Sequence, residues 1–181
     1  MSKAKLFILG LPGSGKGTIS KILRDHYGNS TRYYDVGAIL REQATEDNHI
    51  KQVHAKGGLV DSDRVLNIFD DALSQDSYIV DGSPRKPNEA QYILTHPKWL
   101  DDPGILIHLN LDANVAKQRL LQRGRFDDAE NILETRMQRY FDTTVQSVEA
   151  FTNANRCITI DAANDPNTVA TTIIKALWDL K

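Results

Sequence analysis

The residues best suited to chemistry are in a glycine-rich run at positions 10–18, Gly-Leu-Pro-Gly-Ser-Gly-Lys-Gly-Thr. This run follows a short apolar segment and precedes a helical pattern of apolar residues. Glycines at this spacing let backbone N–H groups turn inward around phosphate oxygens, and the N-terminus of the next helix attracts the same anion. Lys16 supplies a mobile positive charge for the terminal phosphates. We therefore predict a nucleotide-phosphate site made by Gly13, Ser14, Gly15, Lys16, Gly17 and Thr18.

A carboxylate at the end of another apolar segment supports this interpretation. Tyr78, Ile79 and Val80 are typical of a buried strand, and Asp81 follows them directly. An acid in this position lies near the magnesium ion of a bound nucleoside triphosphate. We predict that the Thr18 hydroxyl and the Asp81 carboxylate hold Mg²⁺ through water molecules.

The composition of the 181-residue chain, which has the length of one domain, limits its class. Its 22 Lys and Arg against 24 Asp and Glu give a formal net charge of −2, without the basic surplus of a nucleic-acid-binding protein. Cys157 is the only cysteine, which excludes an internal disulfide and a multi-cysteine metal site. No apolar run reaches the ~18 residues of a membrane span, and Pro12 and Gly13 end the first one before signal-peptide length. We expect a cytoplasmic monomer with no membrane or nucleic-acid partner.

Apolar segments alternate with helical patterns along the chain. Four segments are typical of strands buried on both faces, residues 6–9, 77–80, 105–109 and 157–160, and residues 32–34 are a weaker fifth candidate. The patterns between them predict helix faces that include Val65, Phe69, Val115, Leu120, Leu121, Val169, Ile173, Leu177 and Trp178. The alternation predicts an α/β fold, a doubly wound parallel five-stranded sheet flanked by helices.

The longest predicted helix begins near Asp127, because Asp127-x-x-Glu130 matches a capping box. Its buried stripe is predicted to contain Leu133, Met137, Tyr140, Phe141, Thr144, Val148 and Phe151. Trp99 and Trp178 are interpreted as packing residues. The five histidines, His26, His49, His54, His96 and His108, show no metal-ligand spacing and are interpreted as surface or packing residues.

Two stretches interrupt the alternation of strands and helices. Residues 36–75 are predicted to form consecutive helices with a break at Gly57 and Gly58, and residues 123–127 form a short polar crossing. Excursions of this kind on an α/β scaffold are where substrate-closing lids occur. We predict a single domain with a core at residues 1–35, 76–122 and 128–181, a helical insert at 36–75 and a short lid at 123–127.

Five motifs, in order along nearly the whole chain, resemble those of the adenylate kinase family, the nucleoside monophosphate kinases. The glycine-rich run carries that family's Gly-Lys-Gly-Thr, and Asp81-Gly-Ser-Pro-Arg85 is similar to its Asp-Gly-Phe-Pro-Arg, with Ser83 in place of Phe. The others are Val36-Gly-Ala-Ile-Leu-Arg41, Lys56-Gly-Gly-Leu-Val60, and Arg119-Leu-Leu-Gln-Arg123-Gly-Arg125 with Arg136 eleven residues later. The single residue between Arg123 and Arg125 resembles short-lid members and leaves no room for a zinc-binding lid.

The resemblance implies phosphoryl transfer from ATP to a nucleoside monophosphate with Mg²⁺, AMP being the first expectation. It implies catalytic roles for Lys16, Arg85, Arg123, Arg125 and Arg136, and ATP contacts from the glycine-rich run, Arg119 and Arg123. Contacts to the monophosphate are implied for Val36, Gly37, Arg41, Val60, Gly82, Arg85 and Glu89, so the insert would bind this substrate. Guanidinium groups suit these roles because they are permanently charged and bind phosphate bidentately.

The acceptor base pocket departs from the family pattern. Val36 and Ala38 replace a hydroxyl and a carboxylate. Because Ala38 removes an acid that in the family helps to organise the waters of the metal, we expect a weaker magnesium site with Asp81 as its main anchor. Glu89 stands where adenylate kinases carry a Gln that reads adenine; a carboxylate only accepts hydrogen bonds and suits the two donors of guanine better, with Asn88 as an alternative amide. Three hypotheses stay open: an adenylate kinase, a kinase for GMP, CMP or UMP, and a nucleotide-sensing module without efficient transfer.

Overall fold

The computed structural model of the protein describes residues 3–123 and 130–180. Arg125, most of the predicted lid at 123–127 and the predicted capping box that begins at Asp127 lie outside the described residues. Among the described residues, none of the helices has the length and apolar character needed to span a membrane.

A five-stranded sheet in which all neighbouring strands are parallel forms the centre of the fold. Its strands are β1 (Lys5–Gly10), β2 (Arg32–Asp35), β3 (Tyr78–Asp81), β4 (Ile105–Asn110) and β5 (Cys157–Asp161), in the order β2-β3-β1-β4-β5. All five predicted strands are present, and the predicted doubly wound parallel α/β sheet is confirmed. From β1 the chain crosses to the edge strand β2, returns to β3 beside β1, and then continues to β4 and β5 on the other side of β1. The connections diverge at β1, so the strand before the glycine-rich run is at the topological switch point, where such sheets bind ligands.

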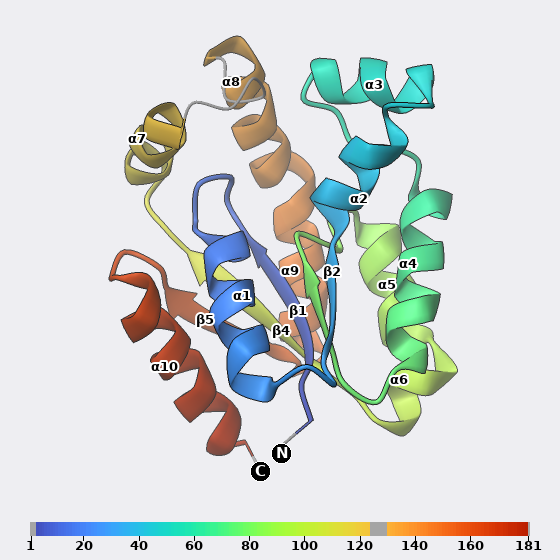
Figure 1. The fold of residues 1–181 in the computed structure, drawn as a ribbon, viewed down its shortest axis with the longest axis vertical. Helices are drawn as coiled ribbons and strands as arrows, with labels where there is room; N and C mark the ends of the chain where they lie inside the picture. Colours follow the sequence, from blue (N-terminus) through green and yellow to red (C-terminus); the bar gives the residue numbers. More distant parts are fainter. Residues whose placement is uncertain (1–2, 124–129, 181) are drawn as a thin grey trace.

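Helices cover both faces of the sheet (Figure 1). Helices α1 (Lys16–Tyr27) and α10 (Pro166–Trp178) pack on one face, and α4 (Ser62–Ser74), α5 (Pro87–Thr95), α6 (Pro97–Asp101) and α9 (Val145–Asn153) pack on the other. Side chains alternate along β1 between these layers, with Leu6 and Ile8 in the first core cluster and Phe7 in the second. The Phe7 ring lies 5.8 Å from the ring of Trp99, which is buried as predicted.

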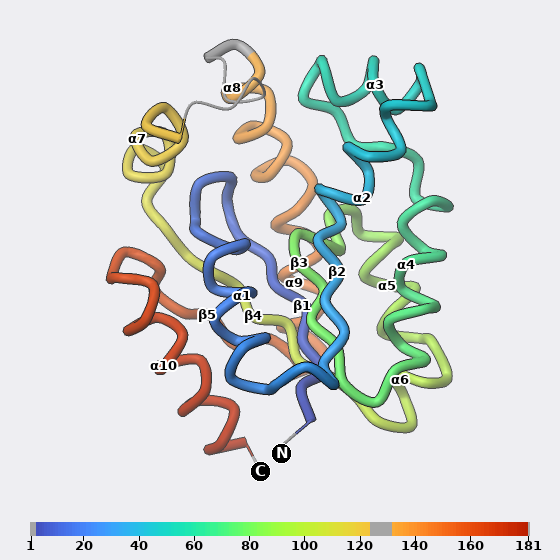
Figure 2. Tube along the Cα trace, in the orientation of Figure 1, coloured from blue at the N-terminus to red at the C-terminus, as the bar shows by residue number. Residues whose placement is uncertain are grey.

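The insert between β2 and β3 is made of helices, as predicted. It contains α2 (Val36–Gln43), α3 (Asn48–Ala55) and α4, with a break at Gly57 and Gly58. In Figure 2, α2 and α3 lie past the carboxyl ends of the strands on one side, α7 (Ala113–Arg123) lies on the other, and α8 (Glu130–Arg139) runs between them. The carboxyl ends of the central strands are therefore flanked by two helical walls.

The predicted long helix is interrupted by a π-helical turn. Helix α8 leads into this turn, η2 (Tyr140–Thr144), which continues into α9. The predicted stripe is buried at Leu133, Tyr140, Thr144, Val148 and Phe151. The prediction for Phe141 is wrong, since 52% of this residue is exposed. Phe141 follows Tyr140 and so lies about 90–100° further round the helix, outside the stripe that contacts the sheet.

Three further helix-face predictions are wrong. Val115, Leu121 and Trp178 are 37%, 52% and 65% exposed. Helix α7 is buried only at Ala116 and Leu120, and the glycine-rich run approaches it closely at Ala116. Trp178 ends α10 about 140° round the helix from the buried Ile173, so it faces away from the core.

Candidate functional site

A cleft of about 700 Å³ opens at the carboxyl ends of β1 and β3. Its walls come from the glycine-rich run at residues 10–18, from α2 and the turn between α3 and α4, and from α7, α8 and the loop after β5. Every predicted site residue that the structure describes lines this cleft. The five motifs, which are far apart in the sequence, therefore meet at one cavity.

The glycine-rich run has a shape fixed by its own backbone. The Ser14 N–H donates to the Leu11 carbonyl and the Thr18 N–H donates to the Gly15 carbonyl, both at 3.0 Å. Gly13 has a φ of +90°, and a Cβ there would lie 2.5 Å from the carbonyl oxygen of Ala116. Only glycine allows this close approach to α7. The run therefore curls against α7 and directs the start of α1 into the cleft.

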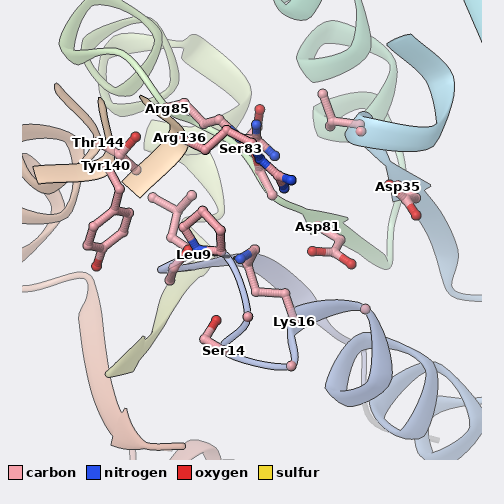
Figure 3. A pocket seen from close by; sticks show the side chains of 18 of the residues that line it. Leu9, Ser14, Lys16, Asp35, Asp81, Ser83, Arg85, Arg136, Tyr140 and Thr144 are labelled. Carbon is pink, nitrogen blue, oxygen red and sulfur yellow. Dashed lines mark hydrogen bonds between the residues drawn. The ribbon is translucent and has the colours of Figure 1, made fainter. Parts of the chain in front are cut away.

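Lys16 lies at the centre of the cleft (Figure 3). Its Nζ donates to the carbonyl oxygens of Gly10 at 2.8 Å and Leu11 at 3.0 Å. Burial lowers the pKa of Lys16 to about 7; Asp81 opposes this shift, and nearby arginines, first Arg85, add to it. The low pKa indicates that the protein places too little negative charge around this ammonium to stabilise its charged form. A bound phosphate would supply that negative charge.

Asp81 ends β3 and faces Lys16 in the cleft (Figure 3). The residue is 5% exposed, and its Oδ2 accepts a hydrogen bond from the Tyr33 hydroxyl at 3.1 Å. Burial raises the pKa of Asp81, and the positive charge of Lys16 opposes this rise. Thr18 lines the same cleft at the start of α1. Among the described residues, no three His, Cys, Asp or Glu side chains gather into a metal-binding group, so these oxygens could hold a cation only together with water or a ligand.

Two arginines from distant motifs meet above Lys16. Figure 3 shows the side chains of Arg85 and Arg136 next to each other. Arg85 donates from Nε to the Gly82 carbonyl at 2.5 Å. Burial lowers the pKa of Arg85, and the charge of Arg136 lowers it further. Like charges held this close in a cleft are expected where an anion binds between them.

Asp35 is a cleft residue that the sequence analysis missed. It ends β2 opposite Asp81 in the strand register, and its Oδ1 accepts from the Ala38 N–H at 2.7 Å, which caps α2. The same oxygen lies 4.0 Å from Nη2 of Arg41. An aspartate directly before a helical pattern is an N-cap signal, and it could have been recognised in the sequence. Asp35 therefore provides, at the carboxyl end of β2, a carboxylate in place of the one that is absent at Ala38.

Glu89 has a structural role that its position in the motif did not predict. It is 2% exposed, and its Oε2 accepts the N–H groups of Arg85 at 2.8 Å and Lys86 at 3.3 Å at the start of α5. Its Oε1 accepts from the Ser62 hydroxyl at 3.2 Å, and that hydroxyl accepts from Asn88 Nδ2 at 3.0 Å. Both carboxylate oxygens thus already have protein partners, and the carboxylate still lines the cleft.

Arg119 lines the cleft but is already bound to protein. Its Nη1 and Nη2 donate to the carbonyl oxygens of Ala162 and Ala163, each at 3.0 Å. These carbonyls belong to the loop after β5, which also lines the cleft. Arg119 therefore holds this loop in place. The lining also contains His54 and Arg139, which the sequence analysis had not assigned to a site.

Comparisons with known proteins identify the family. A family model described as adenylate kinase matches residues 8–156. An adenylate kinase of Prochlorococcus marinus (strain MIT 9515) is 33% identical over 178 residues, covering 94% of this chain and 97% of that protein. Adenylate kinase isoenzyme 1 of Cyprinus carpio is 29% identical over 189 residues, covering 97% and 95%. The resemblance seen in the five motifs is confirmed, and the chain belongs to the adenylate kinase family.

Proposed function

We propose that this protein transfers the terminal phosphoryl group of ATP to AMP and so forms two molecules of ADP. The observation that carries the proposal is the convergence of Lys16, Arg85 and Arg136 on one cleft at the switch point of the sheet. Binding one nucleotide does not need cations from three separate motifs. Transfer between two nucleotides gathers several negative charges, and positioning and electrostatic stabilisation are what such a reaction requires.

The donor binds on the side of the glycine-rich run. Backbone N–H groups at residues 13–18 and the N-terminus of α1 receive its phosphates. Lys16 moves from its two carbonyl partners to the phosphate oxygens. These oxygens provide the neighbouring negative charge that the lowered pKa of Lys16 indicates is missing in the unliganded cleft. Arg123 approaches from α7, and Arg119 fixes the loop after β5 at the outer end of this side.

The acceptor binds on the side of the insert. Arg41 and Arg85 hold its phosphate, and Val36, Val60 and Glu89 surround its base. Arg136 stands between the two sides, close to Arg85, and stabilises the phosphoryl group during transfer. No general base is required from the protein, because the acceptor phosphate is already an anionic nucleophile.

Oxygen donors at the start of α1 and at the end of β3 fit a magnesium ion. The Thr18 hydroxyl and the Asp81 carboxylate are the hard oxygen donors that Mg²⁺ prefers, and Asp81 is fixed by the Tyr33 hydroxyl. Asp35 adds a second carboxylate at the neighbouring strand end. When bound with ATP, Mg²⁺ would neutralise part of the negative charge on the donor's phosphates.

We also propose the division into core, insert at 36–75 and lid at 123–127, the last two closing over the substrates to exclude water. Arg125 would enter with the lid. A cytoplasmic location and a monomeric state stay predictions from the composition and sequence.

A second candidate is a monophosphate kinase with an acceptor other than AMP. The buried Glu89 carboxylate favours it, because this group can only accept hydrogen bonds from a base. The third candidate, a nucleotide-sensing module, would bind nucleotide without forming product.

A coupled assay of ADP formation separates these functions. Purified protein is incubated with ATP, Mg²⁺ and, in separate reactions, AMP, GMP, CMP or UMP. We expect the highest kcat/KM with AMP. A higher value with another monophosphate would establish the second candidate, and no product with any of the four, despite ATP binding, would establish a sensing module.

A further inference from the structure

Arg139 is a cleft residue with no role in the mechanism above. It is the last residue of α8 and lines the cleft one helical turn from Arg136. Its Nε is buried without a hydrogen-bond partner, and no described carboxylate forms an ion pair with this guanidinium. A buried cationic donor without an acceptor is destabilising until an anion approaches. This arrangement is expected of a residue whose partner is a ligand.

The geometry of α8 places Arg139 on the acceptor side of the cleft. A Cβ on Gly57 would lie 3.1 Å from the Ile132 carbonyl oxygen and 3.2 Å from Cγ of Arg136. This face of α8 therefore packs against the turn between α3 and α4. Positions 132, 136 and 139 recur at i, i+4 and i+7 and lie within about 60° around a helix. Arg139 thus shares the face that meets the insert.

The next residue, Tyr140, points in a different direction from Arg139. Tyr140 lies about 90–100° further round the helix, and its hydroxyl pairs with Nε2 of His108 in β4 at 2.7 Å. Since β4 is on the other side of β1 from β3, Tyr140 faces the donor half of the sheet. Arg139, on the other flank of α8, faces the half that contains the insert.

The protein's own carboxylates on the acceptor side already have partners. Asp35 accepts from the Ala38 N–H and lies beside Arg41. Glu89 accepts from the backbone of Arg85 and from Ser62. The anion that completes the shell of Arg139 must therefore come from the ligand. A nucleoside monophosphate bears one such group, its phosphate dianion.

We propose that Arg139 binds the phosphate of the acceptor nucleotide, as a substrate-binding residue beside Arg41 and Arg85. The proposal rests on the proposed function, because it needs a monophosphate on the insert side of the cleft. A planar guanidinium suits this contact, since it can donate two parallel hydrogen bonds to phosphate oxygens.

The test compares ligands that differ only in the phosphate. Calorimetric titrations with AMP, adenosine and ATP are made on the unsubstituted protein, on Arg139→Gln and on Arg32→Gln, a control at an exposed arginine that does not line the cleft. We expect Arg139→Gln to raise the Kd of AMP about 10- to 100-fold, the loss of one charge-assisted contact. The Kd values for adenosine and ATP stay within about twofold, Arg139→Lys recovers part of the loss, and Arg32→Gln changes none of them.

Three results would overturn this assignment. An equal loss of AMP and adenosine binding would show that Arg139 only supports the pocket. A loss confined to ATP would place it on the donor side, and unchanged AMP binding would show no contact. Failure of the proposed function is recognised separately, because the unsubstituted protein would then not bind AMP. The comparison is in that case repeated with GMP, CMP and UMP against their nucleosides, and absence of binding by all of them overturns the Arg139 proposal as well.

Discussion

The two sides of the cleft hold their charges in different ways. On the donor side, the Lys16 ammonium donates to two carbonyls of the glycine-rich run, whose shape is set by backbone hydrogen bonds and by positive-φ glycines. On the acceptor side, side chains fix other groups: Asp35 lies beside Arg41, Glu89 caps the start of α5, and Lys86 Nζ donates to the Val60 carbonyl at 2.6 Å.

This difference indicates how each side tolerates change. A site made from backbone groups depends on a few glycines and one lysine. When one of these residues is substituted, no neighbouring residue can take over its role. A site made from side chains can be altered one residue at a time, since a neighbour can take over a lost charge. The acceptor side has such changes at Val36, Ala38, Ser83 and Glu89, and Asp35 provides a carboxylate near Ala38. We therefore expect the largest single-residue effects on the donor side.

The substitution that tests this difference between the donor and acceptor sides most strongly is Lys16→Met. We expect turnover to fall by at least 10³-fold, because Lys16 is the cation that the glycine-rich run itself holds for the donor phosphates, whereas Arg123 approaches them from α7. The fold should be retained, since burial of the ammonium is unfavourable and its pKa is already lowered. The measurement is the coupled assay, with thermal unfolding as the check on the fold. Lys175→Met, an exposed change on α10, is the control; near-normal turnover of Lys16→Met would mean that the glycine-rich run is not the donor site.

The same contrast explains what the sequence could predict. The donor side was predictable because glycines, Lys16 and Asp81 are adjacent to apolar strands, and strand positions follow from local hydrophobicity. The sheet was predictable for the same reason. The acceptor side was less predictable, because the partners of Glu89 and Asp35 depend on how α2, α4 and α5 pack. Phe141 and Trp178 were misplaced since periodicity does not reveal a π turn or the end of a contact face.

A pH titration tests the donor side without changing a residue. The pKa of Lys16 is about 7 in the unliganded protein, and bound phosphate raises it, so ATP binding above pH 7 takes up a proton. We expect the affinity for ATP to fall by up to about tenfold per pH unit above 7, and to be nearly constant below it apart from titration of the nucleotide itself. The unliganded protein gains stability as the pH rises above 7, because there the unfolded lysine binds the extra proton. Calorimetry in buffers of different ionisation enthalpy measures the uptake, which Lys16→Met should lose. A pH-independent Kd in the unsubstituted protein would contradict this prediction.

On the acceptor side, Glu89→Gln should give a smaller effect. The amide keeps one acceptor and gains a donor, so kcat/KM for AMP relative to GMP should rise about tenfold. Since Oε2 now accepts two backbone N–H groups, stability should fall by about 1 kcal/mol. The ratio is measured in the coupled assay and the stability by urea denaturation, with the exposed Glu149→Gln as the control. An unchanged AMP-to-GMP ratio would mean that Glu89 serves only the cap of α5.

The smallest effect is expected at Asp35, the acceptor-side carboxylate that lies opposite Asp81 in the strand register. Asparagine caps helices about as well as aspartate, so Asp35→Asn should keep the hydrogen bond to Ala38 N–H and remove only the charge. Because Asp35 lies opposite Asp81 and is partly exposed, we expect the Mg²⁺ concentration needed for half-maximal ATP binding to rise about two- to fivefold. Asp35→Ala should show the same rise and also lose about 1 kcal/mol of stability with the cap. ATP binding titrated against Mg²⁺ measures the first effect and urea denaturation the second. Should Asp35→Asn leave the Mg²⁺ requirement unchanged while Asp35→Ala is destabilised, Asp35 would belong to the acceptor helix alone, and Asp81 would serve the cation without a second carboxylate.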